Sequence, residues 1–247
     1  VIIGCKYYFW YGNLYNESKA FIYEDHVLFN KNKTTLIAYI AREKNYTIPN
    51  SVTTIGEGAF NGCHFLTSIK IPNSVTTIGE GAFNGCYSLS SINIPNSVTT
   101  IGKLAFNGCY SLTSINIPNS VTTIENRVFI DCKSLTSINI PNSVTTIGES
   151  AFACCRSLIR INIPNSVTTI GKCAFRFCRR LPSHIKSDII QRFGKEALIH
   201  DSNLFQAQKA QKHTEEHAEN LQPLYPKNVN LPQFGIRNSF KKVGSLT

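Results

Sequence analysis

The fold is decided by residues 71–78, which read Ile-Pro-Asn-Ser-Val-Thr-Thr-Ile and recur along the chain at a constant step. The six copies start 23 residues apart, at Ile48, Ile71, Ile94, Ile117, Ile140 and Ile163. A unit this short cannot bury its own apolar face, so neighbouring units must stack and share one core. The sequence therefore predicts a solenoid of six 23-residue repeats over residues 48–181.

Each unit divides into short segments with different patterns. Residues 66–71 have the L-x-x-I-x-I spacing of a short parallel strand, which the following proline ends because it cannot donate to a ladder. After a Pro-Asn-Ser corner, the β-branched residues 75–78 predict a second strand on the opposite wall. Gly79 interrupts it, and the inward positions of Phe83 and Cys86 predict a single helical turn. The expected fold class is an α/β repeat solenoid.

Phenylalanine and cysteine each occur once per unit at the same step. We expect the rings to form a buried column, and the thiols to act as small buried hydrophobes. The phenylalanines are Phe60, Phe83, Phe106, Phe129, Phe152 and Phe175, and the cysteines are Cys63, Cys86, Cys109, Cys132, Cys155 and Cys178. Disulfides are the alternative, but a regular column pairs no residue uniquely, and Cys5, Cys154 and Cys173 break an even scheme. No Cys-x-x-Cys pair supports a zinc site.

The pattern L-x-S-I-x-I-P-N-S-V-T-T-I-G-x-x-A-F-x-x-C resembles the BspA-type leucine-rich repeats of bacterial and protist surface proteins. The resemblance implies a right-handed leucine-rich-repeat coil with short parallel strands and short helical turns. It also implies a surface that binds other proteins. Residues 21–37 are similar to the hairpin that opens such arrays, although His26 stands where a glycine is usual. Serine replaces the usual asparagine of the general leucine-rich pattern at Ser74, Ser97, Ser120, Ser143 and Ser166, so an asparagine ladder is not assured there.

Both ends of the array are expected to be covered. Residues 1–47 are predicted to plug the first repeat with a hairpin and with aromatic side chains that include Tyr7–Tyr11. The alternative role for these aromatics is a partner-binding patch. Residues 182–194 are predicted to form a capping helix that Ser183 caps, that Gly194 ends, and whose inward face carries Ile185, Ile189, Ile190 and Phe193. Residues 195–247 are expected to comprise a polar helical segment to 222 and a disordered tail.

Composition excludes several classes of protein. Hydrophobic residues make up 42% of the 247 and charged residues 16%, which is ordinary for a globular chain. No run approaches the ~18 apolar residues of a membrane-spanning helix. The net charge of +10 is spread along the chain, which argues against a specific nucleic-acid reader. The chain begins at Val1 and has no methionine, so we expect a start codon or a processed segment to precede it.

No catalytic constellation emerges, so we predict no enzyme and no cofactor. The Gly-Glu-Gly strings at 56–58 and 79–81 are repeat corners rather than a dinucleotide motif. His213 and His217 with Glu216 match the H-x-x-E-H zinc pattern, but the segment offers no third ligand or pocket, so no metal site is predicted. Asn16, Asn32 and Asn45 begin glycosylation sequons, which chance explains in an Asn-rich chain. Cys5 loosely resembles a lipoprotein cysteine.

Sequence variation marks the candidate binding surface. The outward strand positions carry near-identical Ser and Asn rows without the aromatic and Arg anchors of binding hot spots. The residue after each repeat cysteine varies, and residues 150–187 hold seven cations and no acid. We therefore predict partner-binding residues along that edge and the basic end, namely Tyr87, Tyr110, Lys133, Arg156, Arg160, Arg176, Arg179 and Arg180.

Three functions remain open from the sequence. The first is a non-enzymatic protein-interaction or adhesion module, displayed on a cell surface or secreted. The second is an intracellular, cytoplasmic scaffold whose thiols stay reduced. The third is weak binding of acidic polymers through the basic C-terminal repeats. The identity of a protein partner and the oligomeric state do not follow from these residues.

Overall fold

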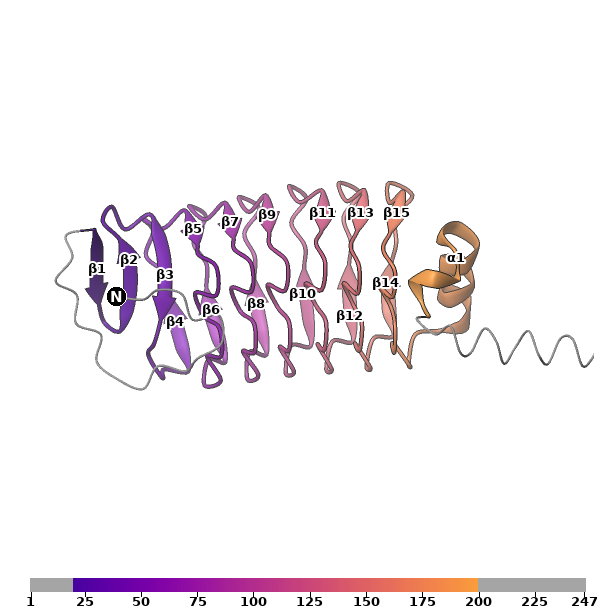
Figure 1. Ribbon diagram of the computed structural model, residues 1–247, viewed down its shortest axis with the longest axis horizontal. Helices are drawn as coiled ribbons and strands as arrows, with labels where there is room; N and C mark the ends of the chain where they lie inside the picture. Colours follow the sequence, from indigo (N-terminus) through magenta and orange to yellow (C-terminus); the bar gives the residue numbers. More distant parts are fainter. Residues whose placement is uncertain (1–19, 200–247) are drawn as a thin grey trace, which may run out of the picture. The chain divides into compact units, whose positions relative to one another are not determined.

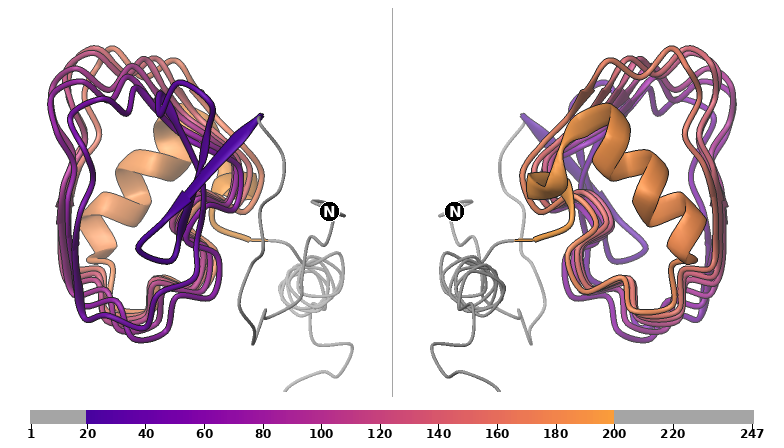
Figure 2. Two further views of the ribbon diagram at one scale, coloured as in Figure 1. Left: turned by 90° about the vertical axis from the view of Figure 1, so that its left-hand side faces the viewer. Right: turned by 90° about the vertical axis from the view of Figure 1, so that its right-hand side faces the viewer.

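The computed structural model describes residues 20–199, which form a single solenoid of stacked coils (Figure 1). Every coil crosses two parallel walls, seen end-on in Figure 2. The threonine wall contains β3 (Thr35–Tyr39), β5 (Thr54–Ile55), β7 (Thr77–Ile78), β9 (Thr100–Ile101), β11 (Thr123–Ile124), β13 (Thr146–Ile147) and β15 (Thr169–Ile170). The serine wall contains β4 (Asn45–Thr47), β6 (Ser68–Lys70), β8 (Ser91–Asn93), β10 (Ser114–Asn116), β12 (Ser137–Asn139) and β14 (Arg160–Asn162). Paired strands are in register one repeat apart, as with Ile69 and Ile92.

The strands are shorter than the residue pattern predicts because the corner takes up backbone donors. In the second repeat, the amide of Val75 donates to the carbonyl of Pro72 at 3.1 Å, which closes a turn, so β7 starts only at Thr77. Ser74 stands where the general pattern has asparagine, and its hydroxyl donates to the Val52 carbonyl of the preceding coil at 2.8 Å. Equivalent serines repeat this bond, so a serine column joins the corners of successive coils.

The segment between the walls consists of consecutive i→i+3 turns rather than a regular helix. Asn84 donates to the Gly81 carbonyl at 2.9 Å, and Cys86 to the Phe83 carbonyl at 3.2 Å. The alternate amides, those of Gly81, Phe83 and Gly85, donate instead to the next coil, at 2.7–2.8 Å. Since half of the amides bond between coils, the chain cannot close a continuous helix. We call this segment the inner turn. Its bonds between coils form a third line of hydrogen bonds along the solenoid, beside those of the two walls.

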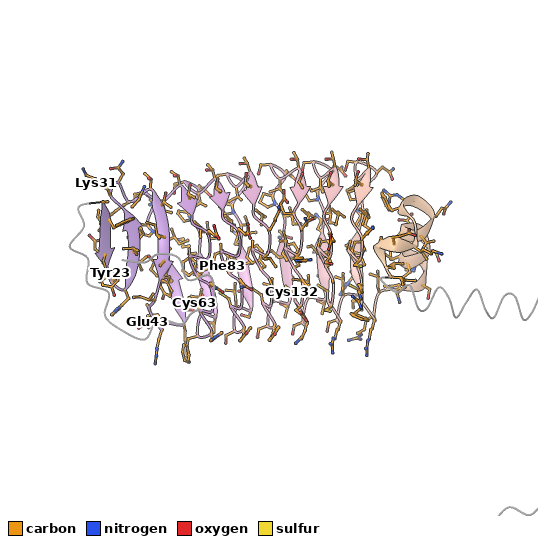
Figure 3. All side chains as sticks on the ribbon, in the orientation of Figure 1. Tyr23, Lys31, Glu43, Cys63, Phe83 and Cys132 are labelled. Carbon is orange, nitrogen blue, oxygen red and sulfur yellow. The ribbon has the colours of Figure 1, made fainter. Side chains whose placement is uncertain are left out.

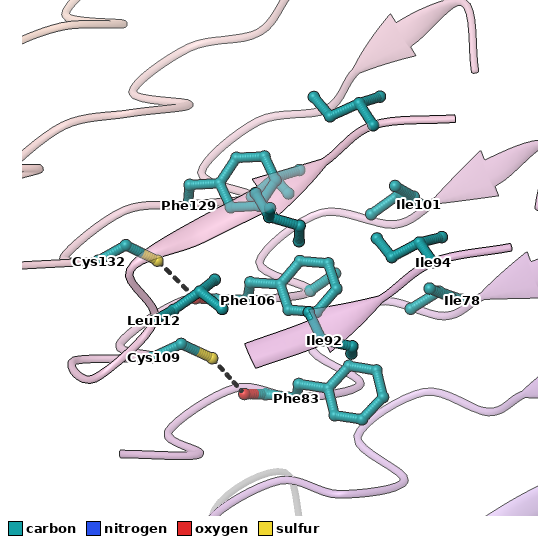
Figure 4. Packing of buried hydrophobic residues seen from close by; sticks show 14 of the residues in the cluster. Ile78, Phe83, Ile92, Ile94, Ile101, Phe106, Cys109, Leu112, Phe129 and Cys132 are labelled. Carbon is teal, nitrogen blue, oxygen red and sulfur yellow. Dashed lines mark hydrogen bonds between the residues drawn. The ribbon is translucent and has the colours of Figure 1, made fainter. Parts of the chain in front are cut away.

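The predicted phenylalanine and cysteine columns are confirmed (Figures 3 and 4). Neighbouring phenylalanine rings have centroids 5.0–5.6 Å apart and interplanar angles of 3–13°. The thiol of Cys109 donates to the carbonyl of Phe83, and that of Cys132 to the carbonyl of Phe106. All eight described cysteines are free, so the column is one of thiols. Cys63, at the first coil, and Cys154 are only half-buried.

Both walls are interrupted at mid-length. Glu125 replaces a glycine that the other repeats keep, and that column has no room for a Cβ: one built on Gly102 would lie 2.6 Å from the Glu80 nitrogen. Within residues 20–199 no hydrogen bond joins β9 to β11, and Figure 1 shows these strands farther apart than their neighbours. The inner turn stays bonded there, through Phe106 to the Val128 carbonyl at 2.9 Å. We call this break in the threonine wall the seam.

The N-terminal end is covered by a hairpin and two tyrosines. Strands β1 (Phe21–Glu24) and β2 (Val27–Asn30) are joined by Asp25 and His26, both at positive φ (48° and 63°), as a tight two-residue hairpin turn requires. His26 therefore takes the conformation that a glycine would. The rings of Tyr39 and Tyr46 pack on Phe60, with centroids 5.0 and 6.0 Å away, and end the phenylalanine column. Tyr7–Tyr11 lie outside the described residues.

The C-terminal end is covered by α1 (Ser183–Phe193), and two expectations about this helix were wrong. Ser183 is the first helical residue and makes no capping bond, because Pro182 occupies the cap position. Ile189 is buried, but Ile190 is 47% exposed. Arg192 fastens the helix by donating to the carbonyls of the last corner, at Ile163 and Pro164, both at 3.0 Å.

The cap extends beyond Gly194, where the sequence analysis ended it. The short 3-10 helix η1 (Lys195–Ala197) accepts bonds from the last coil, from Cys173 to Glu196 at 2.7 Å and from Phe175 to Ala197 at 2.9 Å. Phe175 here makes the bond that its equivalents make to the next coil, as Phe152 does to Ala174, whereas Cys173 bonds one residue later along the chain than its equivalent Ser150, which bonds to Lys172. Gly194, Lys195 and Ala197 stand 23 residues after Gly171, Lys172 and Ala174, so a partial seventh repeat closes the solenoid, with α1 in place of its strands.

Candidate functional site

The surface positions that differ from repeat to repeat line one edge of the solenoid, where the chain passes from the inner turn to the serine wall. Each side chain there comes two residues after a residue with left-handed backbone, at φ of 60–71°. The left-handed residues are Gly62, Gly85, Gly108, Asp131, Cys154 and Phe177. At Gly85 and Cys154 the carbonyl accepts the amide two residues later, at 2.9 and 2.8 Å, which fixes the sharp turn. We call the side chains that follow the turn edge: His64, Tyr87, Tyr110, Lys133, Arg156 and Arg179.

The first part of the turn edge is a continuous stack. His64 lies 4.5 Å from Tyr87, centroid to centroid, and Tyr87 lies 4.6 Å from Tyr110 with the rings 5° apart. Lys133 places its Nζ 3.9 Å above the centroid of Tyr110. The two tyrosines are 42% and 37% exposed, but their faces contact one another, so solvent meets ring edges and hydroxyls. His64 was missed from the sequence, although it stands one repeat before Tyr87.

The second part of the turn edge is cationic. Lys133, Arg156 and Arg176 lie near the half-buried Cys154. The pKa of this thiol is raised, by burial first and then by Asp131, and the three cations offset part of that rise. Arg176 also lies over the ring of Phe177, 4.4 Å from its centroid, and that ring is 47% exposed. Together with the exposed Arg179 and Arg180, these side chains form the basic end, defined as Lys133, Arg156, Arg176, Arg179 and Arg180.

The basic end is without ion-pair partners in the described part of the chain. The ion pairs among the described residues join Lys33 to Glu24, Arg127 to Glu149 and Arg192 to Asp188, none of which belongs to the basic end. Tyr87, Tyr110 and the basic end account for seven of the eight residues that the sequence analysis selected.

Arg160, the eighth selected residue, is not part of this edge. It lies on β14 in the serine wall, in register with Ser137, and lines a shallow hollow with Asn162 and His184. A second hollow on the same wall is lined by Asn50, Lys70, Asn73 and Asn93, among others. Both hollows are open and neither contains a carboxylate.

Metal-ligating side chains do not cluster within residues 20–199. No group of three or more His, Cys, Asp or Glu side chains there could hold a metal ion. His213, Glu216 and His217 lie outside the described residues, as do Asn16 and Cys5. Asn32 and Asn45 are exposed. Among the described helices, none is long and apolar enough to cross a membrane.

Comparison with known proteins identifies the repeat. A family model described as a BspA type leucine rich repeat region matches in six copies, over residues 38–146 and 99–221. A search of curated protein sequences finds no match.

Solved structures share the fold. A leucine-rich repeat protein of T. pallidum is 28% identical with a TM-score of 0.57, and the match covers 71% of this chain and 94% of that one. A leucine rich cell surface protein of Faecalibacterium prausnitzii is 30% identical with a TM-score of 0.57, covering 67% and 54%. A leucine-rich repeat protein of Eubacterium ventriosum is 33% identical with a TM-score of 0.51, covering 64% and 50%. This chain therefore spans about half the length of the last two.

Proposed function

The chain belongs to the BspA-type leucine-rich repeat family, and from this we propose that it is a non-enzymatic interaction module whose binding surface is the turn edge. The fold is of a kind commonly used for protein interaction. The proposal adds which surface of the solenoid does the binding and which residues carry it.

The observation that carries the proposal is the stack of Tyr87, Tyr110 and Lys133, which continues into exposed arginines. Tyrosine and arginine are the side chains that most often dominate binding energy at protein interfaces. The stacked rings are held before any partner arrives, so little side-chain entropy is lost on binding. Apart from Lys70 and Arg160, the strands of the serine and threonine walls carry small polar side chains at their outward positions, and these repeat with little change.

We also propose that the module is displayed at a cell surface or secreted. The support is the relative from Faecalibacterium prausnitzii, which is described as a cell surface protein and is 30% identical to this chain. Adhesion to another cell or to a matrix protein is one use of such a surface.

An intracellular scaffold is the second candidate, because all eight described cysteines are free. Oxidising compartments favour disulfides, whereas the cytosol keeps thiols reduced. A count of maleimide-reactive thiols on protein from its native source, before and after denaturation and with and without reductant, separates the two. Thiols that become reactive only after reduction support the surface location, and thiols that all react on unfolding alone support the scaffold.

Site-specific photo-crosslinking tests the binding surface. A photoreactive phenylalanine analogue replaces Tyr110 in one variant and Thr99, on the threonine wall, in the matched control, and each full chain is irradiated in cells of the source organism. We expect a discrete protein adduct from position 110 and none from position 99. Adducts from position 99 alone, or none from either, would reject the turn edge as the binding surface.

A further inference from the structure

We infer that the basic end of the turn edge binds an acidic polypeptide segment that lies along the solenoid axis. This inference rests on the proposed function, since it names the partner class of the same surface. It concerns Lys133, Arg156, Arg176, Arg179 and Arg180, together with the exposed ring of Phe177.

The positive charges of the basic end are not paired with carboxylates among the described residues. These five cations make no ion pair within residues 20–199, and Lys133, Arg156 and Arg176 come close enough to Cys154 to act on its thiol together. Asp131 acts on the same thiol, and Glu149 acts together with Arg176 on the thiol of Cys173, but neither carboxylate forms an ion pair with the five cations. Holding like charges so close on a folded surface is unfavourable, and an anionic partner removes that repulsion while it gains attraction.

The charges of the basic end also follow one direction. Lys133, Arg156 and Arg179 occupy the same position in three successive coils, so their charges follow the solenoid axis. Paired coils lie ~4.8 Å apart, so the three positions span about 10 Å. An extended polypeptide rises ~3.3 Å per residue, so about three of its residues cover that length. Carboxylates on such a segment meet guanidinium groups, whose planar fork binds a carboxylate through two parallel hydrogen bonds.

The aromatic faces of the turn edge favour a polypeptide over single-stranded nucleic acid as the partner. Binding of single-stranded nucleic acid depends on aromatic faces onto which bases stack. On this edge the tyrosine faces are taken up by His64, by each other and by Lys133, and Arg176 lies over Phe177. Ring edges, hydroxyls and guanidinium groups remain, which suits the carboxylates and small apolar groups of a peptide.

The test measures binding of a fluorescent peptide of alternating Glu and Ala residues to the full chain by anisotropy. The R156E/R179E variant reverses two charges of the basic end. The matched control, K103E/K172E, makes the same change in net charge at exposed lysines of another column. We expect R156E/R179E to weaken binding about tenfold or more, the control to change it little, and added salt to weaken binding to the wild-type chain. Circular dichroism verifies that both variants are folded.

Several outcomes overturn the inference. Absence of peptide binding to the wild-type chain does so, as does an equal loss in both variants, which would reflect net charge alone. Heparin or oligothymidylate that binds more tightly than the peptide, and loses that binding in R156E/R179E, would replace the polypeptide with another polymer. A protein adduct at position 110 combined with no peptide binding would leave the proposed function standing and reject only the acidic partner.

Discussion

The thiol of Cys109 donates a hydrogen bond to the carbonyl oxygen of Phe83, 3.3 Å away in the preceding coil (Figure 4). The same carbonyl already accepts the amide of Cys86 at 3.2 Å, so the thiol satisfies its second lone pair. Cysteine suits this position because it is small, apolar and still able to donate weakly. The bond recurs between successive coils and links the column of thiols to the column of rings.

Replacement of Cys109 by Ala should lower the free energy of unfolding by about 1–2 kcal/mol, since it leaves a small cavity and removes one bond between coils. Urea denaturation followed by circular dichroism measures the change. The matched control is Cys154→Ala, at a half-buried cysteine, which should cost less than about 0.5 kcal/mol. Equal costs at the two positions would contradict a role for the buried thiol bond.

Alkaline pH should destabilise the protein through these thiols. Burial raises the pKa of Cys86, Cys109, Cys132 and Cys155 well above the ordinary value, whereas the same thiols ionise near pH 9 once unfolded. A raised folded-state pKa means that stability is fully present below the unfolded pKa and is lost as pH rises above it.

The expected slope is up to ~1.4 kcal/mol per pH unit for each buried thiol, measured by urea denaturation with reductant between about pH 8 and pH 10.5. Above about pH 10 the buried Tyr39 and the half-buried Tyr46, whose pKa burial raises to about 12, add to the loss. Cys109→Ala removes one thiol and should reduce the slope. A free energy of unfolding that stays constant over this range would refute the prediction.

Replacement of Phe106 by Ala should cost ~3–5 kcal/mol, more than the same change at Phe175. Phe106 stacks between Phe83 and Phe129, with centroids 5.4 and 5.6 Å away, whereas Phe175 stacks on Phe152 at 5.3 Å and has no ring beyond it. Thermal and urea unfolding of both variants measure the difference. Equal losses would show that stacking along the column adds nothing to burial.

The Glu125→Gly substitution should close the seam. Without the Cβ, the coil can approach its neighbour and pair β11 with β9, and each new backbone bond adds roughly 0.5–1.5 kcal/mol. The added flexibility of glycine in the unfolded chain offsets part of this gain. We expect a net rise in the free energy of unfolding and slower hydrogen exchange at residues 122–125.

The control for the seam is Glu80→Gly, which removes an exposed glutamate from a part of the wall that is already paired. It should leave exchange at residues 122–125 unchanged and should not raise stability. Unchanged exchange in Glu125→Gly would mean that the glutamate is not the cause of the seam.

The turn edge was only partly predictable. The repeat step located Tyr87, Tyr110, Lys133, Arg156 and Arg179 in one row, because residues one period apart must be neighbours. It did not show that the rings stack, since that depends on rotamers and on the spacing between coils. Arg160 was selected as one of the seven cations of residues 150–187, and it lies on β14 in the serine wall rather than in this row.

The period of 23 and the residues that keep it determine the coil, its two walls and its buried columns, because side chains at equal positions must stack when every unit is alike. The tertiary structure alone decided where that regularity ends. The seam arises because Glu125 has no space in a column that fits glycine only, and the cap uses residues 195–197 because their carbonyls complete the bonds of the last coil. For the basic end, the period put Lys133, Arg156 and Arg179 in one row, whereas only the tertiary structure showed that its cations form no ion pair within residues 20–199, because ion pairing depends on which side chains the stacked coils bring together.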